Sequence, residues 1–295
     1  MSRIHQALSK AASERAKQSS AVTGADIAEI VAEVRRIPDT GQAELLIDIP
    51  ESPDANVSAL GRERPESGFV RFDWGLDAKY NAFAAGAKEK AGAERFRTLR
   101  SRLFQLADTK SLRRIMVTSS VPGEGKSFVC ANLAQAMLQQ QNRRVLLIDA
   151  DLRLPALHKM LAAPPGPGLS NYLRGECDEH AAIQLGRQNN LYFMPAGDEV
   201  ANPSELLMSD RMKELLRYGA ESFDWVIVDS PPSLPVHDPS LLADLCDGVL
   251  FVVRAASTDF ELVAKAANEF RKKNLLGVVF NQVEKAESYG DYYYR

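Results

Sequence analysis

The chain has 295 residues, of which 45% are hydrophobic and 25% are charged, a composition that is typical of globular proteins and excludes collagen-like or wholly disordered chains. The formal net charge of −3 does not favour nucleic acid as a partner. The three cysteines, Cys130, Cys177 and Cys246, show no ligand-like spacing, which argues against a zinc site or a disulfide framework. Because the apolar runs are strand-sized and no secretory signal opens the sequence, we expect a cytoplasmic protein.

Residues 1–75 predict an N-terminal leader and linker. Ile4, Leu8 and Ala11 sit at helical spacing, and a stronger helical stripe follows at residues 27–37. Residues 38–68 are rich in Pro, Asp, Glu, Ser and Gly, which predicts a linker or a disordered segment. The two helices are either a loosely structured leader or docking elements for a partner or a membrane surface, and the sequence leaves both interpretations open.

Residues 76–285 predict an α/β domain with a mostly parallel sheet. Short, almost continuous apolar runs alternate with helical stretches, which is typical of strands that are covered by helices on both faces. The predicted strands are residues 115–117, 145–148, 191–194, 225–228, 249–253 and 278–280. Residues 286–295 follow the last of these strands and are expected to form a mobile tail.

A phosphate-binding loop (P-loop) is predicted between the first of these strands and the helical run at residues 128–140. Glycines let the loop amides curl around phosphate oxygens, and the helix N-terminus adds positive potential. The lysine is expected to reach the β- and γ-phosphates and the serine after it to bind Mg²⁺. Such loops normally open with glycine, where this chain has Ser120. The predicted nucleotide contacts are Ser120, Gly123, Glu124, Gly125, Lys126 and Ser127.

Three carboxylates follow buried strands at two further places. Asp149 and Asp151 come after the second strand, and Asp229 comes after the strand at 225–228. Because the carboxyl ends of parallel strands share one edge of the sheet, we expect these side chains beside the P-loop. Carboxylates there can hold Mg²⁺ and polarise an incoming hydroxyl. The sequence therefore predicts Mg²⁺-dependent nucleotide binding, with Ser127, Asp151 and the Walker B residue Asp229 as metal ligands.

The Asp-x-Asp-x-Arg run at residues 149–153 resembles the Walker A′ motif of the bacterial tyrosine kinases (BY-kinases), autokinases of capsule and exopolysaccharide loci. The resemblance runs from about residue 83 to the C-terminus. It is carried by residues 119–127, 149–153, Pro155, His158, 168–170, 202–207, 229–232 and Asp238. It implies a P-loop domain that is related to partition ATPases and transfers the γ-phosphoryl group of ATP to tyrosines in the C-terminal tail of a neighbouring subunit.

Two sequence features agree with this resemblance. Four of the chain's eight tyrosines fall in its last seven residues, and these are the expected phosphorylation sites Tyr289, Tyr292, Tyr293 and Tyr294. The run from Glu94 through Arg97 to Arg100 places three charged residues on one flank of a helix. It is either a solvated charged face or, as the resemblance implies, a surface for ring-like self-association.

The resemblance also implies a mechanism and partners. With ATP and Mg²⁺ as cofactors, Lys126 neutralises the phosphates while Asp149 or Asp151 orients the attacking tyrosine hydroxyl, whose usual pKa near 10 keeps it neutral at pH 7. Asn281 is expected at the adenine. The expected activator is a separate polysaccharide co-polymerase that recruits the kinase to the inner membrane, and a tyrosine phosphatase is the expected antagonist.

An alternative is a nucleotide-switch ATPase of the partition or division-site type, which phosphorylates no protein. Those proteins usually carry a signature lysine near the start of the loop, where this chain has Val121, and they lack a terminal tyrosine cluster. A third interpretation, a non-catalytic ATP-binding scaffold, is hard to reconcile with the complete set of Lys126, Ser127 and Asp229.

Overall fold

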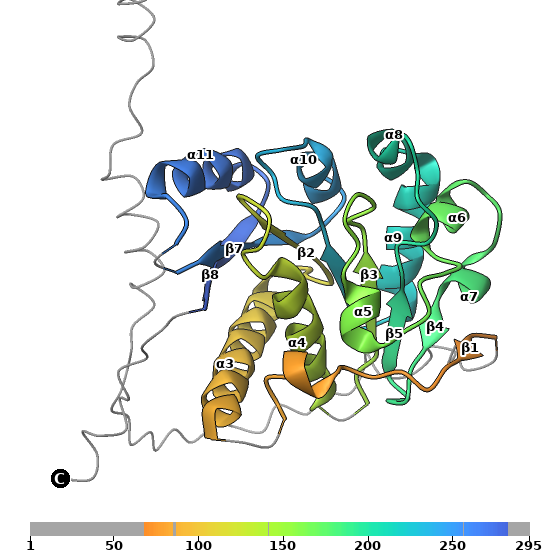
Figure 1. Ribbon diagram of the computed structural model, residues 1–295, viewed down its shortest axis with the longest axis horizontal. Coiled ribbons are helices and arrows are strands. Elements are labelled where there is room, and N and C mark those ends of the chain that lie inside the picture. The colour runs from red at the N-terminus through yellow and green to blue at the C-terminus, as the bar shows by residue number, and fades with distance from the viewer. Residues whose placement is uncertain (1–67, 85–86, 141, 256, 283–295) are drawn as a thin grey trace, which may run out of the picture. The chain divides into compact units, whose positions relative to one another are not determined.

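The computed structural model describes residues 68–84, 87–140, 142–255 and 257–282. Within these ranges, eight strands form one sheet in the order β1-β4-β5-β3-β6-β2-β7-β8 (Figure 1). Neighbouring strands are parallel, except for the antiparallel pair β4 and β5. The strands are β1 (Val70–Arg71), β2 (Arg114–Ser119), β3 (Val145–Asp149), β4 (Gln184–Leu185), β5 (Leu191–Met194), β6 (Trp225–Asp229), β7 (Gly248–Arg254) and β8 (Leu275–Asn281).

Helices cover both faces of this sheet, as the almost continuous burial of the strands requires. The helices are η1 (Ala78–Tyr80), α3 (Ala87–Thr109), α4 (Lys126–Leu138), α5 (Leu157–Leu161), α6 (Leu169–Leu173), α7 (Glu179–Ala182), α8 (Pro203–Leu207), α9 (Asp210–Ser222), α10 (Asp238–Ala243) and α11 (Phe260–Arg271). Successive residues of β2 point to opposite faces of the sheet. Ile115 packs in the cluster that includes α3 and α4, and Met116 packs in the cluster that includes α9 and α11. The predicted α/β class is confirmed.

The six strands predicted from apolar runs are all present, and β1 and β4 are additional. Both additional strands are two residues long, too short to show an apolar pattern. β1 shows that the folded domain begins before residue 76. Trp74 is 1% exposed and packs edge-on against Phe193, with ring centroids 5.8 Å apart. Residues 68–75, which were expected to lie in the linker, thus contribute a strand and a buried ring to the described part of the chain.

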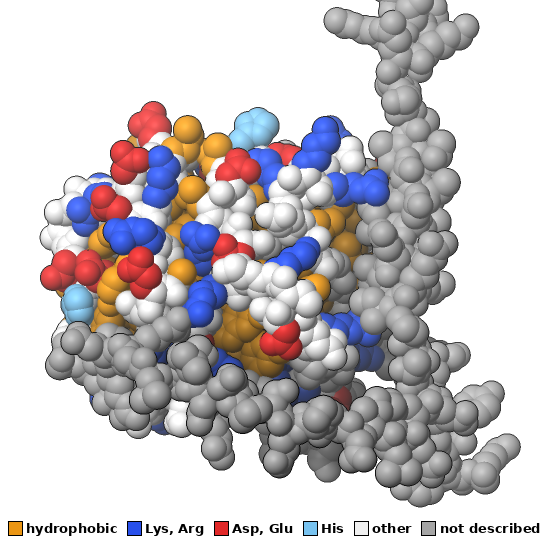
Figure 2. All heavy atoms as spheres, turned by 180° about the vertical axis from the view of Figure 1, so that it is seen from behind, with side chains coloured by type: hydrophobic (Ala, Val, Ile, Leu, Met, Phe, Trp, Pro, Cys, Tyr) orange, Lys and Arg blue, Asp and Glu red, His pale blue; other side chains and the backbone are white. Residues whose placement is uncertain are grey.

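Strand register brings the predicted site together. Asp229 at the end of β6 is paired with Val117 of β2 on one side and with Asp149 of β3 on the other. Three strand ends that are far apart in the sequence thus meet at the edge of the sheet where the P-loop begins. The far side of the molecule shows basic and acidic side chains intermixed (Figure 2). None of the helices within the described ranges is long and apolar enough to cross a membrane.

Candidate active site

The P-loop has the backbone that its glycines predict. Gly123 and Gly125 have φ angles of 85° and 95°, in the left-handed region that favours glycine. Gly125 is also the N-cap of α4, and a Cβ atom there would lie 1.9 Å from the Asn281 side-chain nitrogen. The free amides at the start of α4 therefore face the loop, in the arrangement that binds phosphate.

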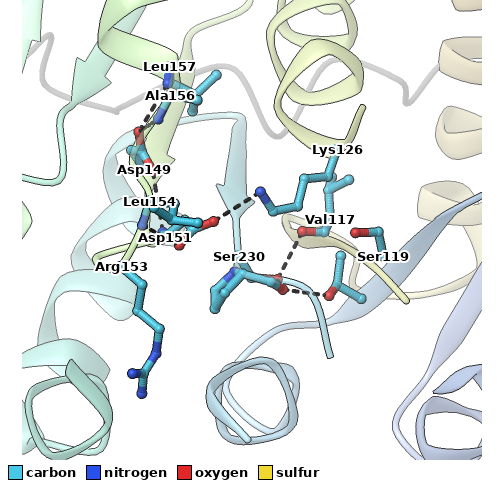
Figure 3. Close-up of polar contacts among 12 residues, drawn as sticks. Val117, Ser119, Lys126, Asp149, Asp151, Arg153, Leu154, Ala156, Leu157 and Ser230 are labelled. Carbon is cyan, nitrogen blue, oxygen red and sulfur yellow. Dashed lines mark hydrogen bonds and ion pairs between the residues drawn. The ribbon is translucent and has the colours of Figure 1, made fainter. Parts of the chain in front are cut away.

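Hydrogen bonds tie the end of β2, where the P-loop begins, to the loop after β6. The Ser230 hydroxyl donates to the Val117 carbonyl at 3.0 Å, and the Thr118 hydroxyl donates to the Pro231 carbonyl at 2.9 Å (Figure 3). Next to them, Ser120 is fully buried, and its hydroxyl has no hydrogen-bond partner among the described residues. Because buried polar groups are normally paired, this hydroxyl has unused hydrogen-bonding capacity at the start of the P-loop.

Lys126 is held by one of the Walker A′ carboxylates. Its Nζ atom lies 2.9 Å from Asp151 Oδ2, and the two side chains are 14% and 3% exposed (Figure 3). Burial alone would lower the pKa of Lys126, but the negative charges of Asp229 and Asp151 outweigh it and raise the pKa above its usual value. The lysine is therefore a permanent positive charge at the mouth of the P-loop.

Asp149 and Asp151 have different surroundings, although they are two residues apart. Asp149 accepts hydrogen bonds from the backbone amides of Ala156 and Leu157 at 3.2 and 3.1 Å, which ties it to the start of α5. Burial and the charge of Asp229 raise the pKa of Asp149 well above its usual value. Asp151 instead faces Lys126 and accepts a hydrogen bond from the Leu154 amide at 3.0 Å. Only Asp151 is directed toward the P-loop lysine.

Asp229 is an acidic side chain with unused bonding capacity. It is fully buried, and neither carboxylate oxygen forms a hydrogen bond of good geometry with the described residues, although the Ser127 hydroxyl and the Cys130 thiol lie close to it. Burial and the nearby charge of Asp151 raise the pKa of Asp229 to about 6, while Lys126 and the Ser127 hydroxyl act in the opposite direction. A divalent cation would compensate the cost of burying this charge.

Two predicted nucleotide contacts have other partners. The buried Glu124 carboxylate accepts hydrogen bonds from the Val121 amide at 2.8 Å, the Arg254 amide at 3.2 Å and the Thr258 hydroxyl at 2.7 Å. Asn281, expected at the adenine, donates its side-chain N–H to the Glu124 carbonyl at 2.9 Å. Both side chains therefore hold the loop in shape, and the Glu124 backbone amide is the part of that residue still open to phosphate.

A dense carboxylate cluster is not formed. No group of three or more His, Cys, Asp or Glu side chains in the described part of the chain is arranged to hold a metal ion. Because Mg²⁺ usually takes only one or two protein carboxylates and completes its shell with water and substrate phosphates, a sparse set still fits it. Ser127, Asp151 and Asp229, the predicted metal ligands, lie close to one another at this edge of the sheet.

Sequence reasoning missed the environment of Arg153. Its guanidinium donates to Asp238 at 2.7 Å and to the Ser204 hydroxyl at 3.1 Å, and Asp238 is 1% exposed. This contact joins the Walker A′ loop to the starts of α8 and α10. The three residues lie within the motifs that carry the resemblance, but their sequence separation hides the contact.

The predicted self-association residues lie on α3 beside the C-terminal end of α4. Glu94 and Arg97 form an ion pair, and Arg97 Nε also donates to Gln139 at 3.3 Å. Arg100 donates to the Ala136 carbonyl at 2.9 Å, so it caps α4 within the same chain. The predicted phosphorylation sites Tyr289, Tyr292, Tyr293 and Tyr294 lie outside the described residues.

Comparison with known proteins agrees with this geometry. Residues 115–293 match the family described as CobQ/CobB/MinD/ParA nucleotide binding domain. Tyrosine-protein kinase YwqD of Bacillus subtilis is 34% identical over 227 residues, which are 76% of this chain and 95% of YwqD. The succinoglycan biosynthesis transport protein ExoP of Rhizobium meliloti is 35% identical over 207 residues, which are 68% of this chain but 26% of ExoP.

Solved structures give the same assignment. The kinase domain of the Escherichia coli tyrosine kinase ETK superposes with a TM-score of 0.61 at 32% identity and covers 68% of this chain and 80% of that domain. The septum site-determining protein MinD of Pyrococcus horikoshii, with a TM-score of 0.50 and 23% identity, shares the fold. The kinase interpretation is thereby favoured over the nucleotide-switch alternative. The chain is a nucleotide-binding domain protein of the MinD/ParA type and belongs to the bacterial tyrosine-protein kinase family.

Proposed function

We propose that this chain binds ATP and Mg²⁺ at the P-loop and transfers the γ-phosphoryl group to the tail tyrosines of a neighbouring copy, as a regulator of exopolysaccharide polymerisation and export. One observation carries the proposal. Lys126, Asp151 and Asp229 converge at the joined ends of β2, β3 and β6. That set supplies the positive charge and the oxygen ligands that phosphoryl transfer needs.

The residues present fit ATP and Mg²⁺. The Ser120 hydroxyl and both Asp229 oxygens are buried without a hydrogen bond of good geometry to the described residues, and the left-handed glycines open the loop amides toward a phosphate. Ser127 and Asp229 would hold the metal ion, assisted by Asp151. When bound, Mg²⁺ neutralises charge on the β- and γ-phosphates.

The chain's own residues divide the chemistry between them. Lys126 and the loop amides hold the phosphate oxygens, which draws Lys126 away from Asp151. The freed Asp151 carboxylate then accepts the proton of the tyrosine hydroxyl. The tyrosine oxygen bonds to the γ-phosphorus, and the bond from that phosphorus to the β–γ bridging oxygen breaks, which releases ADP. Asp149 is anchored to the amides that begin α5, and it orients this loop.

The first experiment maps phosphate on the full chain after incubation with ATP and Mg²⁺. We expect phosphotyrosine at Tyr289, Tyr292, Tyr293 or Tyr294 by mass spectrometry, and its loss in Lys126→Met. Lys265→Met, which removes an exposed lysine of α11, is the matched control and should keep full activity. Release of inorganic phosphate without phosphotyrosine would support the nucleotide-switch alternative instead.

A mixing experiment tests transfer between subunits. The Lys126→Met chain keeps its tyrosines but lacks the P-loop lysine, while a chain with all four tail tyrosines changed to Phe keeps its P-loop. Neither should label alone. When the two are mixed with labelled ATP, we expect label on the Lys126→Met chain, and its absence would exclude transfer to a neighbouring copy.

We also propose that Glu94, Arg97 and Arg100 contribute to a ring-like homo-oligomer. The support is the position of Glu94 and Arg97 on the exposed side of α3, with side chains 68% and 42% exposed. Sedimentation velocity should show smaller assemblies for Arg97→Glu. Arg95→Glu, at an exposed neighbouring position, should sediment as the unchanged chain does.

A membrane-bound co-polymerase is the proposed activator, and a tyrosine phosphatase the proposed antagonist. The segment that matches this chain is about a quarter of ExoP, which is described as a transport protein. In ExoP, therefore, a segment similar to this chain is part of a larger transport protein. We propose that here the transport component is a separate inner-membrane protein that recruits the kinase from the cytoplasm. Co-sedimentation of the chain with membranes that contain the co-polymerase, and not with membranes that lack it, tests this recruitment.

A further inference from the structure

Leu154, in the loop after β3, is the most exposed large apolar side chain in the described part of the chain. It is 70% exposed, whereas Leu152, two positions earlier in the same loop, is 5% exposed and packs in the core. Single exposed leucines are common on protein surfaces, so exposure alone assigns no role to this residue. What matters is its position beside the carboxylate that faces Lys126.

Leu154 is bonded directly to Asp151. Its backbone amide donates to Asp151 Oδ1 at 3.0 Å, while Oδ2 of the same carboxylate lies 2.9 Å from Lys126 Nζ (Figure 3). Because the Asp151 side chain is buried, a group from another molecule reaches it only past the residues around it. Within residues 150–156 of this loop, Arg153 and Leu154 are the exposed residues.

The charged end of Arg153 is held away from Asp151. Its Nε atom donates to the buried Asp238 carboxylate at 2.7 Å, and its Nη2 atom donates to the Ser204 hydroxyl at 3.1 Å. Figure 3 shows this side chain directed away from Lys126. Of the two exposed side chains in the loop, Leu154 is therefore the one that can contact a group held at Asp151.

The contact of Arg153 with Ser204 joins this loop to a second exposed apolar side chain. Ser204 lies in the first turn of α8, and Met208, the C-cap of that helix, donates its amide to the Ser204 carbonyl at 3.1 Å. Met208 is 58% exposed, second to Leu154 among the large apolar side chains of the described residues. The segments that carry these two side chains are thus held together next to the active site.

The tail of a second copy has the composition to cover this surface. Residues 289–295 contain four tyrosines and no aliphatic side chain, so aromatic rings are the apolar groups that this segment offers. A tyrosine ring is rigid, and with its hydroxyl at Asp151 it extends outward past Leu154, where contact removes apolar surface from water. On the basis of the proposed function, we propose that Leu154 binds the ring of the acceptor tyrosine and that Met208 contacts a neighbouring ring of the same tail.

Steady-state kinetics with the full chain as enzyme test this assignment. The acceptor is a tagged Lys126→Met chain at increasing concentrations, with saturating ATP and Mg²⁺, and label is counted on the acceptor after purification through its tag. In the enzyme, Leu154→Ala should raise KM for the acceptor by about fivefold or more and Met208→Ala by about twofold, with kcat changed by less than about twofold, because apolar contact is lost in binding and transition state alike.

Two further variants separate the apolar contact from other effects. Leu154→Met keeps an apolar side chain of similar volume and should keep KM, whereas Leu262→Ala, which shortens an exposed leucine of α11, should change neither constant. The affinity for ATP, the melting temperature and the sedimentation coefficient of Leu154→Ala should equal those of the unchanged chain, since the side chain is exposed.

The outcomes distinguish this inference from the proposed function on which it rests. An unchanged KM in either alanine variant overturns the contact assigned to that residue, and an equal rise of KM in Leu154→Met overturns the apolar contact. Smaller assemblies of Leu154→Ala would assign the surface to contact between folded domains instead. Absence of label on the acceptor with the unchanged chain as enzyme would overturn the proposed function itself, and this inference with it.

Discussion

Lys126 Nζ lies 2.9 Å from Asp151 Oδ2, so the lysine expected at the phosphates is paired with the carboxylate expected at the tyrosine hydroxyl. In the proposed reaction Lys126 must leave Asp151 to reach the phosphates, and Asp151 must leave Lys126 to accept a proton. Phosphates that attract Lys126 would at the same time free Asp151 as a proton acceptor. In the proposed mechanism, this ion pair would link nucleotide binding to the release of the proton acceptor.

Asp151→Asn separates the two roles of this pair. With the carboxylate removed, Lys126 no longer has to leave an anionic partner, so ATP binding measured in EDTA should be as tight as in the unchanged chain or tighter. The rate of tail phosphorylation with Mg²⁺ should fall by about 100-fold or more, because the proton acceptor is lost. Weaker ATP binding in EDTA together with an unchanged phosphorylation rate would contradict this assignment.

Asp229→Asn should stabilise the nucleotide-free protein at pH 7.5. The carboxylate is buried with a pKa raised to about 6, against about 3.9 in an unfolded chain, so the folded state is favoured at low pH and loses stability as the pH rises from about 4 through 6. Removing the charge should recover on the order of 1–3 kcal/mol at pH 7.5 and almost nothing at pH 4. Urea unfolding at the two pH values measures the difference, with the exposed Asp108→Asn as the control.

The affinity for Mg²⁺ and nucleotide together should depend on pH through the same carboxylate. Protons compete with the metal ion once the pH falls below about 6, the pKa of Asp229, so we expect affinity to weaken by up to about tenfold per pH unit below that value. Calorimetric titrations between pH 5 and pH 7.5 measure this change. The dependence should be flatter in Asp229→Asn, and an equally steep profile in that variant would assign the proton to another group.

Glu124→Ala should destabilise the P-loop. The substitution leaves the Val121 and Arg254 amides and the Thr258 hydroxyl without the acceptor that they share. Hydrogen bonds to a buried charged group are strong, so we expect a loss of about 2–4 kcal/mol in the free energy of unfolding and weaker ATP binding. Glu269→Ala, at an exposed position of α11, should change the free energy of unfolding by less than about 0.5 kcal/mol.

The elements predicted correctly are those whose signal is local and repeated. β2, β3, β5, β6 and β7 are near-continuous apolar runs because most of their residues are buried between two helical layers, and β8, at the edge of the sheet, is partly buried. β1 and β4 leave no such signal, since two residues cannot show a period, and the pairing of β1 with β4 joins segments more than 100 positions apart. For the same reason the sequence analysis assigned Trp74 to the linker, although its ring is buried against the folded sheet.

The P-loop was predictable because strand, glycines, Lys126 and helix are contiguous, so the local backbone already fixes where the amides point. The roles of Glu124 and Asn281 were not, because their partners are 130 and 157 residues distant in the sequence. The sequence alone predicted that the P-loop and its carboxylates lie at the ends of β2, β3 and β6, and the strand register brings these three ends together. Only the tertiary structure decided that Asp151 rather than Asp149 meets Lys126, because the direction of a side chain depends on packing that no local pattern records.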